Sequence, residues 1–315
     1  MMRIFQGVRA LSLAGLCLAA LAAGATAQEA GWPRSFANAD GTTTEIPAPP
    51  QRILSTAVSI TGTLLAVDAP VVASGSAGNG SYFAQWAPVA EARGVANAWP
   101  AGGVDIEAAY AAEPDLIIVS TSGADSALDQ LAELQAIAPT IVLDYGGQTW
   151  QQLAGEIGEA TGLEEQVAAR VSAFDQYIAD AAGKIAVPAG SANIISFNGP
   201  GQDNPIARAG GVHAQLLSAL GFAVEDPDPS WHAQANLRQD FVWAPYEKLV
   251  ELTAATTFLL ARDDEGAQAF IDDPVLANVP SVKAGQVYGL GRNSFRIDYY
   301  SATEIVDGIV AHFAR

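Results

Sequence analysis

The chain has 315 residues, half of them hydrophobic, and a formal net charge of −19 at pH 7. This strong negative charge argues against nucleic acid and anionic membrane surfaces as partners. The apolar content is sufficient for two cores of ordinary domain size. Cys17 is the only cysteine, so the fold is expected to hold without a disulfide.

The N-terminus has the pattern of an export signal. Arg3 and Arg9 precede a long apolar run, and residues 25–27 are the small residues of a cleavage site. This pattern is typical of a secretory signal peptide over residues 1–27, because the apolar run is too short and wrongly flanked for a membrane span. Its removal takes away two arginines and no acid, which makes the net charge −21. We expect an exported protein without membrane insertion.

Strands and helices alternate through the first half of the remaining chain. A hairpin-like lead over residues 35–45 comes first, and a long loop is expected from Ser76 to Gly103. Ser59 or Thr61 is expected to cap the first helix. The predicted strands cover residues 52–56 and 71–75, a run ending at Ser120, and the segment PTIVLDY, with helices before residue 113 and over residues 124–137.

The second half repeats this alternation after two consecutive helices. Trp150 to Thr161 predicts a helix ended by Gly162, and residues 163–184 predict one of roughly 33 Å at 1.5 Å per residue. Further strands are expected over residues 192–197, 256–261 and 286–290, and helices over residues 211–220, 245–252, 267–271 and 300–313.

The element order predicts an α/β protein with two three-layer lobes. We expect an N-terminal lobe over residues 28–162, an interlobe helix over residues 163–186 and a C-terminal lobe over residues 187–315. A single helix between lobes permits only small hinge motion, and a ligand is expected in the cleft outside the carboxyl ends of the strands. The carboxyl ends of the predicted strands are expected near Thr56, Ser76, Ser120, Phe197, Arg262 and Gly291.

Four segments in order carry a family resemblance: PQRILSTAVSITGTLLAVDAPVVASG, IEAAYAAEPDLIIVS, GEATGLEEQVAARV and QVYGLGRNSFRIDYYSA. With them the chain resembles the helical-backbone periplasmic binding proteins of iron–siderophore and cobalamin importers, most closely the ferric-enterobactin (catecholate) type. The resemblance implies a periplasmic monomer without a cofactor. Such a protein captures an Fe(III)–siderophore complex and delivers it to an inner-membrane ABC permease dimer with its ATPase. Cobalamin or another ferric siderophore is the alternative ligand.

A ferric tris-catecholate has a charge near −3 on an aromatic shell, so local cations and aromatic rings must overcome the negative field of the protein. Arginine meets both needs, because its fork donates to oxygens and its plane stacks on rings. The alternative for each arginine is a surface salt bridge. The candidate ligand-binding residues are Arg296, Arg238, Arg208, Arg292, Tyr300, Trp231, Tyr82 and Trp86. Asp298 is expected to cap the last helix, and one of Tyr299 and Tyr300 to pack inward.

Direct metal binding and catalysis are the rival interpretations. Importers of bare zinc or manganese use clustered histidines with carboxylates, whereas His213, His232 and His312 are far apart in this sequence. His232, beside Trp231, is the one candidate iron ligand. The sequence has no nucleophile elbow, phosphate loop or metalloprotease helix, so no catalytic residue and no enzymatic activity are predicted, and a secreted enzyme is the less favoured class.

Two glutamates have matching positions in the two lobes. Glu107 and Glu247 each open the helix that precedes a strand. The family resemblance implies that such acids meet arginines on the two permease subunits. The alternative is an acid that complements a helix N-terminus, which stabilises by a few tenths of a kcal/mol.

Overall fold

A computed structural model describes residues 31–236 and 239–315. Residues 32–315 form one compact unit. The predicted signal peptide, residues 1–27, and Arg238 lie outside the described residues. None of the described helices is long and apolar enough to cross a membrane.

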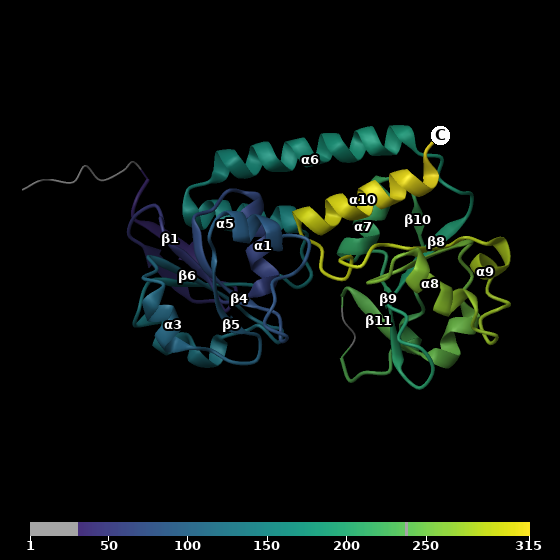
Figure 1. Cartoon of the computed structure of the whole chain (residues 1–315), viewed down its shortest axis with the longest axis horizontal. Helices are drawn as coiled ribbons and strands as arrows, with labels where there is room; N and C mark the ends of the chain where they lie inside the picture. The colour runs from purple at the N-terminus through teal and green to yellow at the C-terminus, as the bar shows by residue number, and fades with distance from the viewer. Residues whose placement is uncertain (1–30, 237–238) are drawn as a thin grey trace, which may run out of the picture. The chain divides into compact units, whose positions relative to one another are not determined.

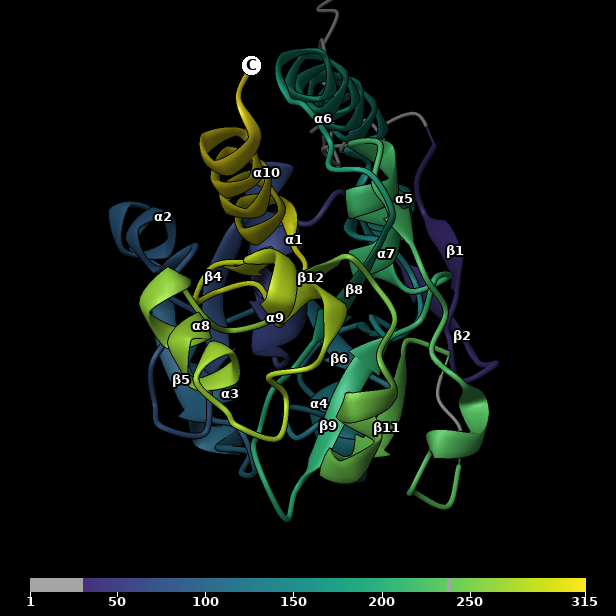
Figure 2. The same cartoon turned by 90° about the vertical axis from the view of Figure 1, so that its right-hand side faces the viewer.

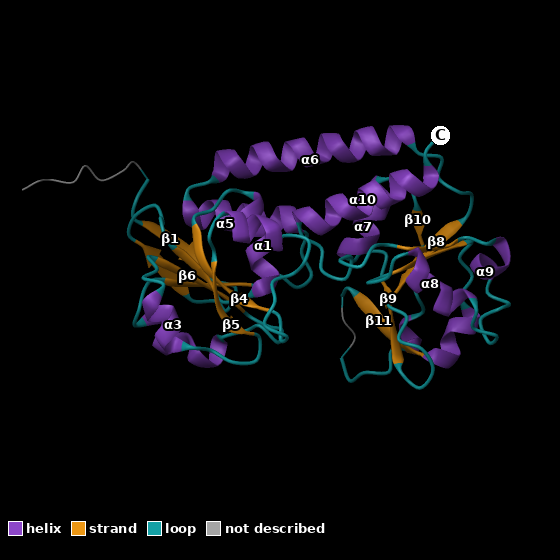
Figure 3. Ribbon diagram, viewed as in Figure 1, coloured by secondary structure: helices purple, strands orange, loops and turns teal. Residues whose placement is uncertain are grey.

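The first half of this unit is built on a five-stranded parallel sheet with the order β5-β4-β3-β6-β7 (Figures 1 and 3). All five residues of β6, LIIVS, are buried, as a parallel strand covered on both faces requires. The strands are β3 (Ile53–Ser55), β4 (Val71–Ser76), β5 (Ala96–Pro100), β6 (Leu116–Ser120) and β7 (Thr140–Leu143), and the antiparallel hairpin β1 (Arg34–Ala37) and β2 (Thr43–Ile46) precedes them.

The helices of this half surround the sheet (Figure 3). They are α1 (Val58–Ala66), α2 (Ala87–Ala92), α3 (Ile106–Ala111), the 3-10 turn η1 (Leu128–Gln130), α4 (Leu131–Gln135) and α5 (Trp150–Thr161). Helix α5 begins with a capping box, in which the Thr149 side chain accepts from the backbone of Gln152, and ends at Gly162 with φ 78°. Glycine adopts this left-handed conformation without steric cost, so α5 stops where the sequence predicts.

The second half contains a mixed sheet with the order β11-β9-β8-β12-β13, and β10 pairs with β8. Strands β8, β12 and β13 are parallel to one another, whereas β9 is antiparallel to both β8 and β11. The strands are β8 (Ser191–Ile195), β9 (Asp203–Ala207), β10 (Ala223–Val224), β11 (Phe241–Pro245), β12 (Thr256–Leu259) and β13 (Val287–Gly289). The helices are α7 (Val212–Ala219), η2 (Pro229–Trp231), η3 (Tyr246–Glu251), α8 (Asp264–Ile271), α9 (Pro280–Ala284) and α10 (Tyr299–Phe313).

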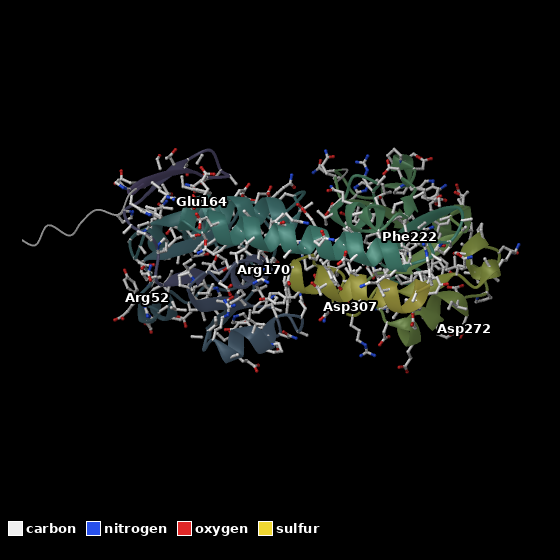
Figure 4. The ribbon with its side chains drawn as sticks, turned by 90° about the horizontal axis from the view of Figure 1, so that it is seen from above. Arg52, Glu164, Arg170, Phe222, Asp272 and Asp307 are labelled. Atoms are coloured by element: carbon white, nitrogen blue, oxygen red, sulfur yellow. The ribbon has the colours of Figure 1, made fainter. Side chains whose placement is uncertain are left out.

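The predicted interlobe helix is present as α6 (Glu164–Lys184), which has 21 residues and a length of about 32 Å. Helix α10 runs alongside it (Figures 1, 2 and 4). The Tyr177 hydroxyl of α6 donates to Asp307 of α10 at 2.6 Å, and the Arg170 guanidinium lies 5.0 Å from the ring centre of Tyr299. The α/β architecture with two lobes and a connecting helix is therefore as predicted, and a second helix reinforces the connection.

Two local predictions are wrong, and one strand pairing was not predicted. The expected loop from Ser76 to Gly103 contains α2 and the edge strand β5, whose short Ala- and Pro-containing sequences have little periodicity. Strands β9 and β11 form a pairing that the sequence did not indicate. The first helix has no cap from its own side chains: the Asp125 carboxylate accepts the backbone N–H of Ser59 at 2.9 Å.

Candidate ligand-binding site

A cavity of about 410 Å³ is lined by segments from both halves of the unit. Its walls are Ser59, residues 122–123, 145–150 and Leu153 from the first half, and residues 212–213, 240–241, Trp243 and 295–298 from the second. In the first half these segments follow the carboxyl ends of β3, β6 and β7, as the position of ligands in α/β sheets predicts. Phe197, Arg262 and Gly291, the strand ends expected in the second half, are not among the lining residues.

Arg296 is the one arginine among the described residues that line this cavity. Its guanidinium carbon lies 5.3 Å from the ring centre of Tyr145 and 5.5 Å from that of Phe295. The Ser301 hydroxyl donates to the Arg296 carbonyl at 2.6 Å, which fixes the backbone at this position. Two rings therefore hold a half-buried cation at the cavity wall through cation–π contacts.

Tyr145 is in turn held by the first half of the chain. Its hydroxyl donates to Asp125 at 3.0 Å, and the other carboxylate oxygen of Asp125 accepts the Ser59 N–H. Burial raises the pKa of the Tyr145 phenol, and the nearby Asp125 charge adds to this effect. The phenol is therefore neutral at physiological pH, and its ring presents a fixed face to Arg296.

His213 contacts the loop that carries Arg296. Its Nε2 atom lies 2.9 Å from the Ser294 carbonyl, and its ring packs against Phe241 at 5.4 Å between centres. Phe241 also stacks on Phe295 at 6.2 Å. Burial lowers the pKa of His213 to about 4, so at neutral pH the ring is uncharged and Nε2 donates to the carbonyl. The neutral imidazole thus anchors the loop that carries Arg296.

This burial predicts a dependence of stability on pH. An unfolded histidine gains its proton near pH 6.5, whereas folded His213 resists protonation until about pH 4. Stability is therefore lost as the pH falls from 6.5 to 4, by about 3 kcal/mol relative to a non-titrating side chain. Chemical denaturation of the wild-type protein and of His213→Gln across this range measures the difference. Parallel curves for the two proteins would contradict the expectation.

Two tryptophans, Trp150 and Trp243, form part of the cavity wall. The indole N–H groups of Trp150 and Trp243 are buried and have no hydrogen-bond partner within the described residues. Because these nitrogen atoms are not accessible, the two tryptophans contribute ring surface rather than hydrogen-bond donors to the cavity wall. Trp243 is half-buried, whereas Trp150 is almost fully buried.

Asp298 lines the cavity and caps α10, as expected. Its carboxylate accepts from the backbone N–H groups of Tyr300 at 2.9 Å and Ser301 at 3.0 Å. It also accepts from Gln85 at 3.0 Å, which links the start of α10 to the first half of the chain. Burial raises the pKa of Asp298, and these hydrogen bonds oppose the rise. The residue is thus a cap and a tie between the two halves.

Three predicted ligand-binding aromatics lie elsewhere. Trp86 is fully buried in the core, so its prediction as a ligand residue is wrong. The Tyr82 hydroxyl donates to the Val95 carbonyl at 3.1 Å, and its ring packs on Trp86 at 5.0 Å. Tyr300 packs against Tyr299, and neither lines the cavity. Tyr299 contacts the core as one of the pair was expected to do.

Arg292 and Arg208 were also predicted to bind ligand, and neither lines the cavity. Arg292 is 72% exposed and pairs with Asp263 at 2.5 Å, so it is a surface ion pair rather than a cavity residue. The Arg208 guanidinium lies 3.7 Å from Asp226, and its backbone N–H donates to the carbonyl of cavity residue Asp240 at 2.9 Å. Arg208 is therefore beside the cavity wall without lining it.

Trp231 and His232 lie outside the cavity and make other contacts. Trp231 lines a separate cavity of about 250 Å³, which corrects its assignment to the interlobe site. The His232 Nδ1 accepts from the backbone N–H of Trp243 at 3.1 Å, and its Nε2 donates to the Asn236 carbonyl at 2.8 Å. Because both ring nitrogens are engaged, His232 has no free ligand atom for iron in this conformation. No group of three or more metal-ligating side chains is present within residues 31–236 and 239–315.

Glu107 and Glu247 are both exposed and lie outside the cavity. Glu107 is in the first turn of α3, and Glu247 is in the first turn of η3. No ion pair joins either carboxylate to another described residue. Both acids are therefore available at the surface.

The sequence did not single out Tyr145, His213, Trp243 or Phe295 as ligand-contacting residues. Tyr145 could have been predicted, because it ends the predicted strand PTIVLDY and ligands bind at the carboxyl ends of strands in α/β sheets. Trp243 and Phe241 belong to β11, which was not among the predicted strands.

Two lobes, a connecting helix and a cavity lined by both lobes are the architecture of a two-lobed ligand-binding protein. The periplasmic binding protein family matches residues 53–293, and the chain belongs to this family. It is similar to the ferric enterobactin-binding periplasmic protein FepB of Escherichia coli O6:H1 (strain CFT073), with 37% identity over 314 residues that cover 96% of this chain and 97% of FepB.

Solved structures agree with this assignment. The chain resembles holo-ViuP with 52% identity and a TM-score of 0.87, covering 90% of this chain and 96% of that chain. Staphylococcus aureus SirA complexed with staphyloferrin B has a TM-score of 0.69 at 19% identity, covering 88% and 97% of the two chains, and supports the fold alone.

Proposed function

We propose that this protein captures a ferric catecholate siderophore in the periplasm and delivers it to an inner-membrane ABC permease for iron uptake. The observation that carries the proposal is the Arg296 guanidinium held between Tyr145 and Phe295 at the wall of the interlobe cavity. The similarity to FepB over nearly the full length of both chains supports the same ligand class.

The chemistry of the cavity suits an anionic aromatic ligand. Arg296 donates to catecholate oxygens, and the rings of Trp243 and Phe295 supply aromatic surface at the cavity wall. Asp240 and Asp298 also line the cavity. The attraction for an anionic ligand must therefore come from cations close to it, because the overall field of the protein is negative. Arg238, two residues before Asp240 in the sequence, is the proposed second cation, and Arg208 a neighbouring one.

The protein's role in this proposal is binding without chemistry. The iron complex is cargo, no cofactor is required, and the protein acts as a monomer that is exported by a signal peptide cleaved near Ala27. Glu107 and Glu247, exposed in the first and second halves, are the proposed contacts with the permease dimer and its ATPase.

Tryptophan fluorescence tests the ligand class, because Trp150 and Trp243 line the cavity and a bound ferric complex should quench them. The panel contains ferric enterobactin, a ferric hydroxamate, cobalamin and free Zn²⁺. We expect saturable quenching by ferric enterobactin, and recovery of the complex unchanged after incubation. Preferential binding of cobalamin or of the hydroxamate would show that the proposed ligand class, a ferric catecholate, is wrong. Chemical modification of the complex would indicate an enzyme.

A further inference from the structure

Asp125 is a buried acid that lies behind the cavity wall rather than in it. The residue is 8% exposed and is not among those that line the cavity. Both of its oxygens nevertheless contact residues that do. Its Oδ1 accepts from the Tyr145 hydroxyl at 3.0 Å, and its Oδ2 accepts from the backbone N–H of Ser59 at 2.9 Å. Asp125 therefore joins two segments of the wall without reaching the ligand space.

The contact with Ser59 ties this unit to helix α1. The N-cap side chain of α1 makes no capping hydrogen bond, and the first turn of the helix contains no acid. The Asp125 carboxylate supplies what is missing, because it accepts one of the free N–H groups at the helix start and complements the positive end of the helix dipole. The Tyr145 hydroxyl is thus held, through Asp125, at the start of a regular helix.

The loop that carries Arg296 rests on the same helix. Gly62 lies about one turn beyond Ser59 on α1, and a Cβ added there would be 2.6 Å from Oδ2 of Asp298. Asp298 therefore packs against the bare backbone of α1. It follows Arg296 by two positions and caps α10. The ring of Tyr145 and the Arg296 loop are consequently both placed by α1.

Gly123 leaves the space that the Tyr145 hydroxyl occupies. A Cβ at this position would overlap the hydroxyl oxygen and would lie 2.7 Å from Oδ1 of Asp125, and the backbone there has φ 96°. Both the space and the left-handed conformation therefore require glycine. The hydroxyl is thus enclosed on the side away from Arg296, where it donates to Asp125.

We propose that Asp125 is a positioning residue for ligand binding. It fixes the Tyr145 ring, whose centre lies 5.3 Å from the Arg296 guanidinium carbon, and thereby sets how strongly the cavity binds an anionic aromatic ligand. The inference rests on the proposed function, and it adds to the determinants of affinity a residue that does not touch the ligand.

The Arg296 guanidinium depends on its ring neighbours for its orientation. Within residues 31–236 and 239–315 no ion pair joins it to an acid, and the rings of Tyr145 and Phe295 are its recorded cation–π partners. A tyrosine ring that has lost its hydrogen bond can turn about its side-chain torsions. Binding would then have to order the ring, which lowers affinity by about two- to tenfold for one side chain.

The test is a double-mutant cycle on affinity for ferric enterobactin, measured by fluorescence quenching. It compares Asp125→Ala, Tyr145→Phe and the double variant with the wild type. Tyr145→Phe keeps the ring and removes only the hydroxyl that Asp125 holds. We expect each single variant to bind about three- to tenfold more weakly, and the double variant to bind no more weakly than the weaker single variant.

A conservative variant and a matched control separate positioning from helix capping. Asp125→Asn should retain wild-type affinity, because its amide oxygen can accept from Ser59 and its NH₂ group can donate to the phenol oxygen. Asp105→Ala is the control: Asp105 caps α3 by accepting the Ala108 N–H at 3.0 Å, and it does not line the cavity. This variant should lose thermal stability, as the loss of a cap does, and keep its ligand affinity.

NMR of the ligand-free protein tests the same role without the ligand. The Arg296 Nε–H resonance, assigned by its absence from Arg296→Ala, is displaced by the ring current of Tyr145 because the guanidinium lies over that ring. We expect it to move towards the position of a solvent-exposed arginine in Asp125→Ala and in Tyr145→Phe. It should stay in place in Asp125→Asn and Asp105→Ala.

The outcomes separate the inference from the function on which it rests. Additive losses of affinity in the double variant would overturn it, because Asp125 would then act by a route other than Tyr145. An equal loss in Asp105→Ala, or an unmoved Arg296 resonance in Tyr145→Phe, would overturn it as well, and the latter reading holds even if Asp125→Ala does not fold. A wild-type protein that ferric enterobactin does not quench would overturn the proposed ligand, while the NMR comparison still decides the role of Asp125.

Discussion

Replacing Arg296 by alanine is expected to weaken ferric-catecholate binding at least tenfold. The guanidinium is half-buried at the cavity wall between the rings of Tyr145 and Phe295. Truncation of one partner of a desolvated charge contact typically costs about 2–5 kcal/mol, because the other charge is left unpaired. Fluorescence titration with ferric enterobactin measures the change in dissociation constant.

The controls for this prediction come from the same loop. Arg296→Lys should recover only part of the affinity, because an ammonium cannot reproduce the planar fork or its stacking. Arg292→Ala is the matched control, since Arg292 is four positions away, exposed and paired with Asp263 outside the cavity. Arg292→Ala should bind ligand normally. If it loses affinity while Arg296→Ala does not, the assignment of the cavity cation is wrong.

Replacing both Glu107 and Glu247 by alanine is expected to abolish iron uptake through the permease and leave ligand affinity almost unchanged. Both carboxylates are exposed, and neither residue lines the cavity. In the proposed docking mode, the double replacement removes both charge contacts with the permease at once. Growth on a ferric catecholate as the sole iron source measures uptake, and fluorescence quenching measures affinity.

Glu133→Ala/Glu265→Ala provides the control for this pair. Glu133 and Glu265 are also exposed acids in the first turn of a helix, α4 in the first half and α8 in the second. The control variant has the same change in net charge, so a general electrostatic effect would appear in both. Loss of ligand affinity in Glu107→Ala/Glu247→Ala would show instead that these acids are structural.

The sequence by itself determined the elements whose signals are local. The helix over residues 163–184 and the ends of α5 were predicted within one residue, because the pattern of a helix and the stop signal Gly162 act within a few positions. The cap of α10 by Asp298 was predicted for the same reason. The alternation of strands and helices then determined the α/β class.

Only the tertiary structure decided which side chains meet at the cavity. Trp86 and Trp243 are alike as aromatic residues in the sequence, yet one is fully buried in the core and the other lines the cavity. Arg292 and Arg296 are four residues apart, and one pairs at the surface while the other stacks on Tyr145 from the opposite half of the chain. These outcomes depend on side-chain direction and on contacts between residues some 150 positions apart, which local sequence signals do not encode.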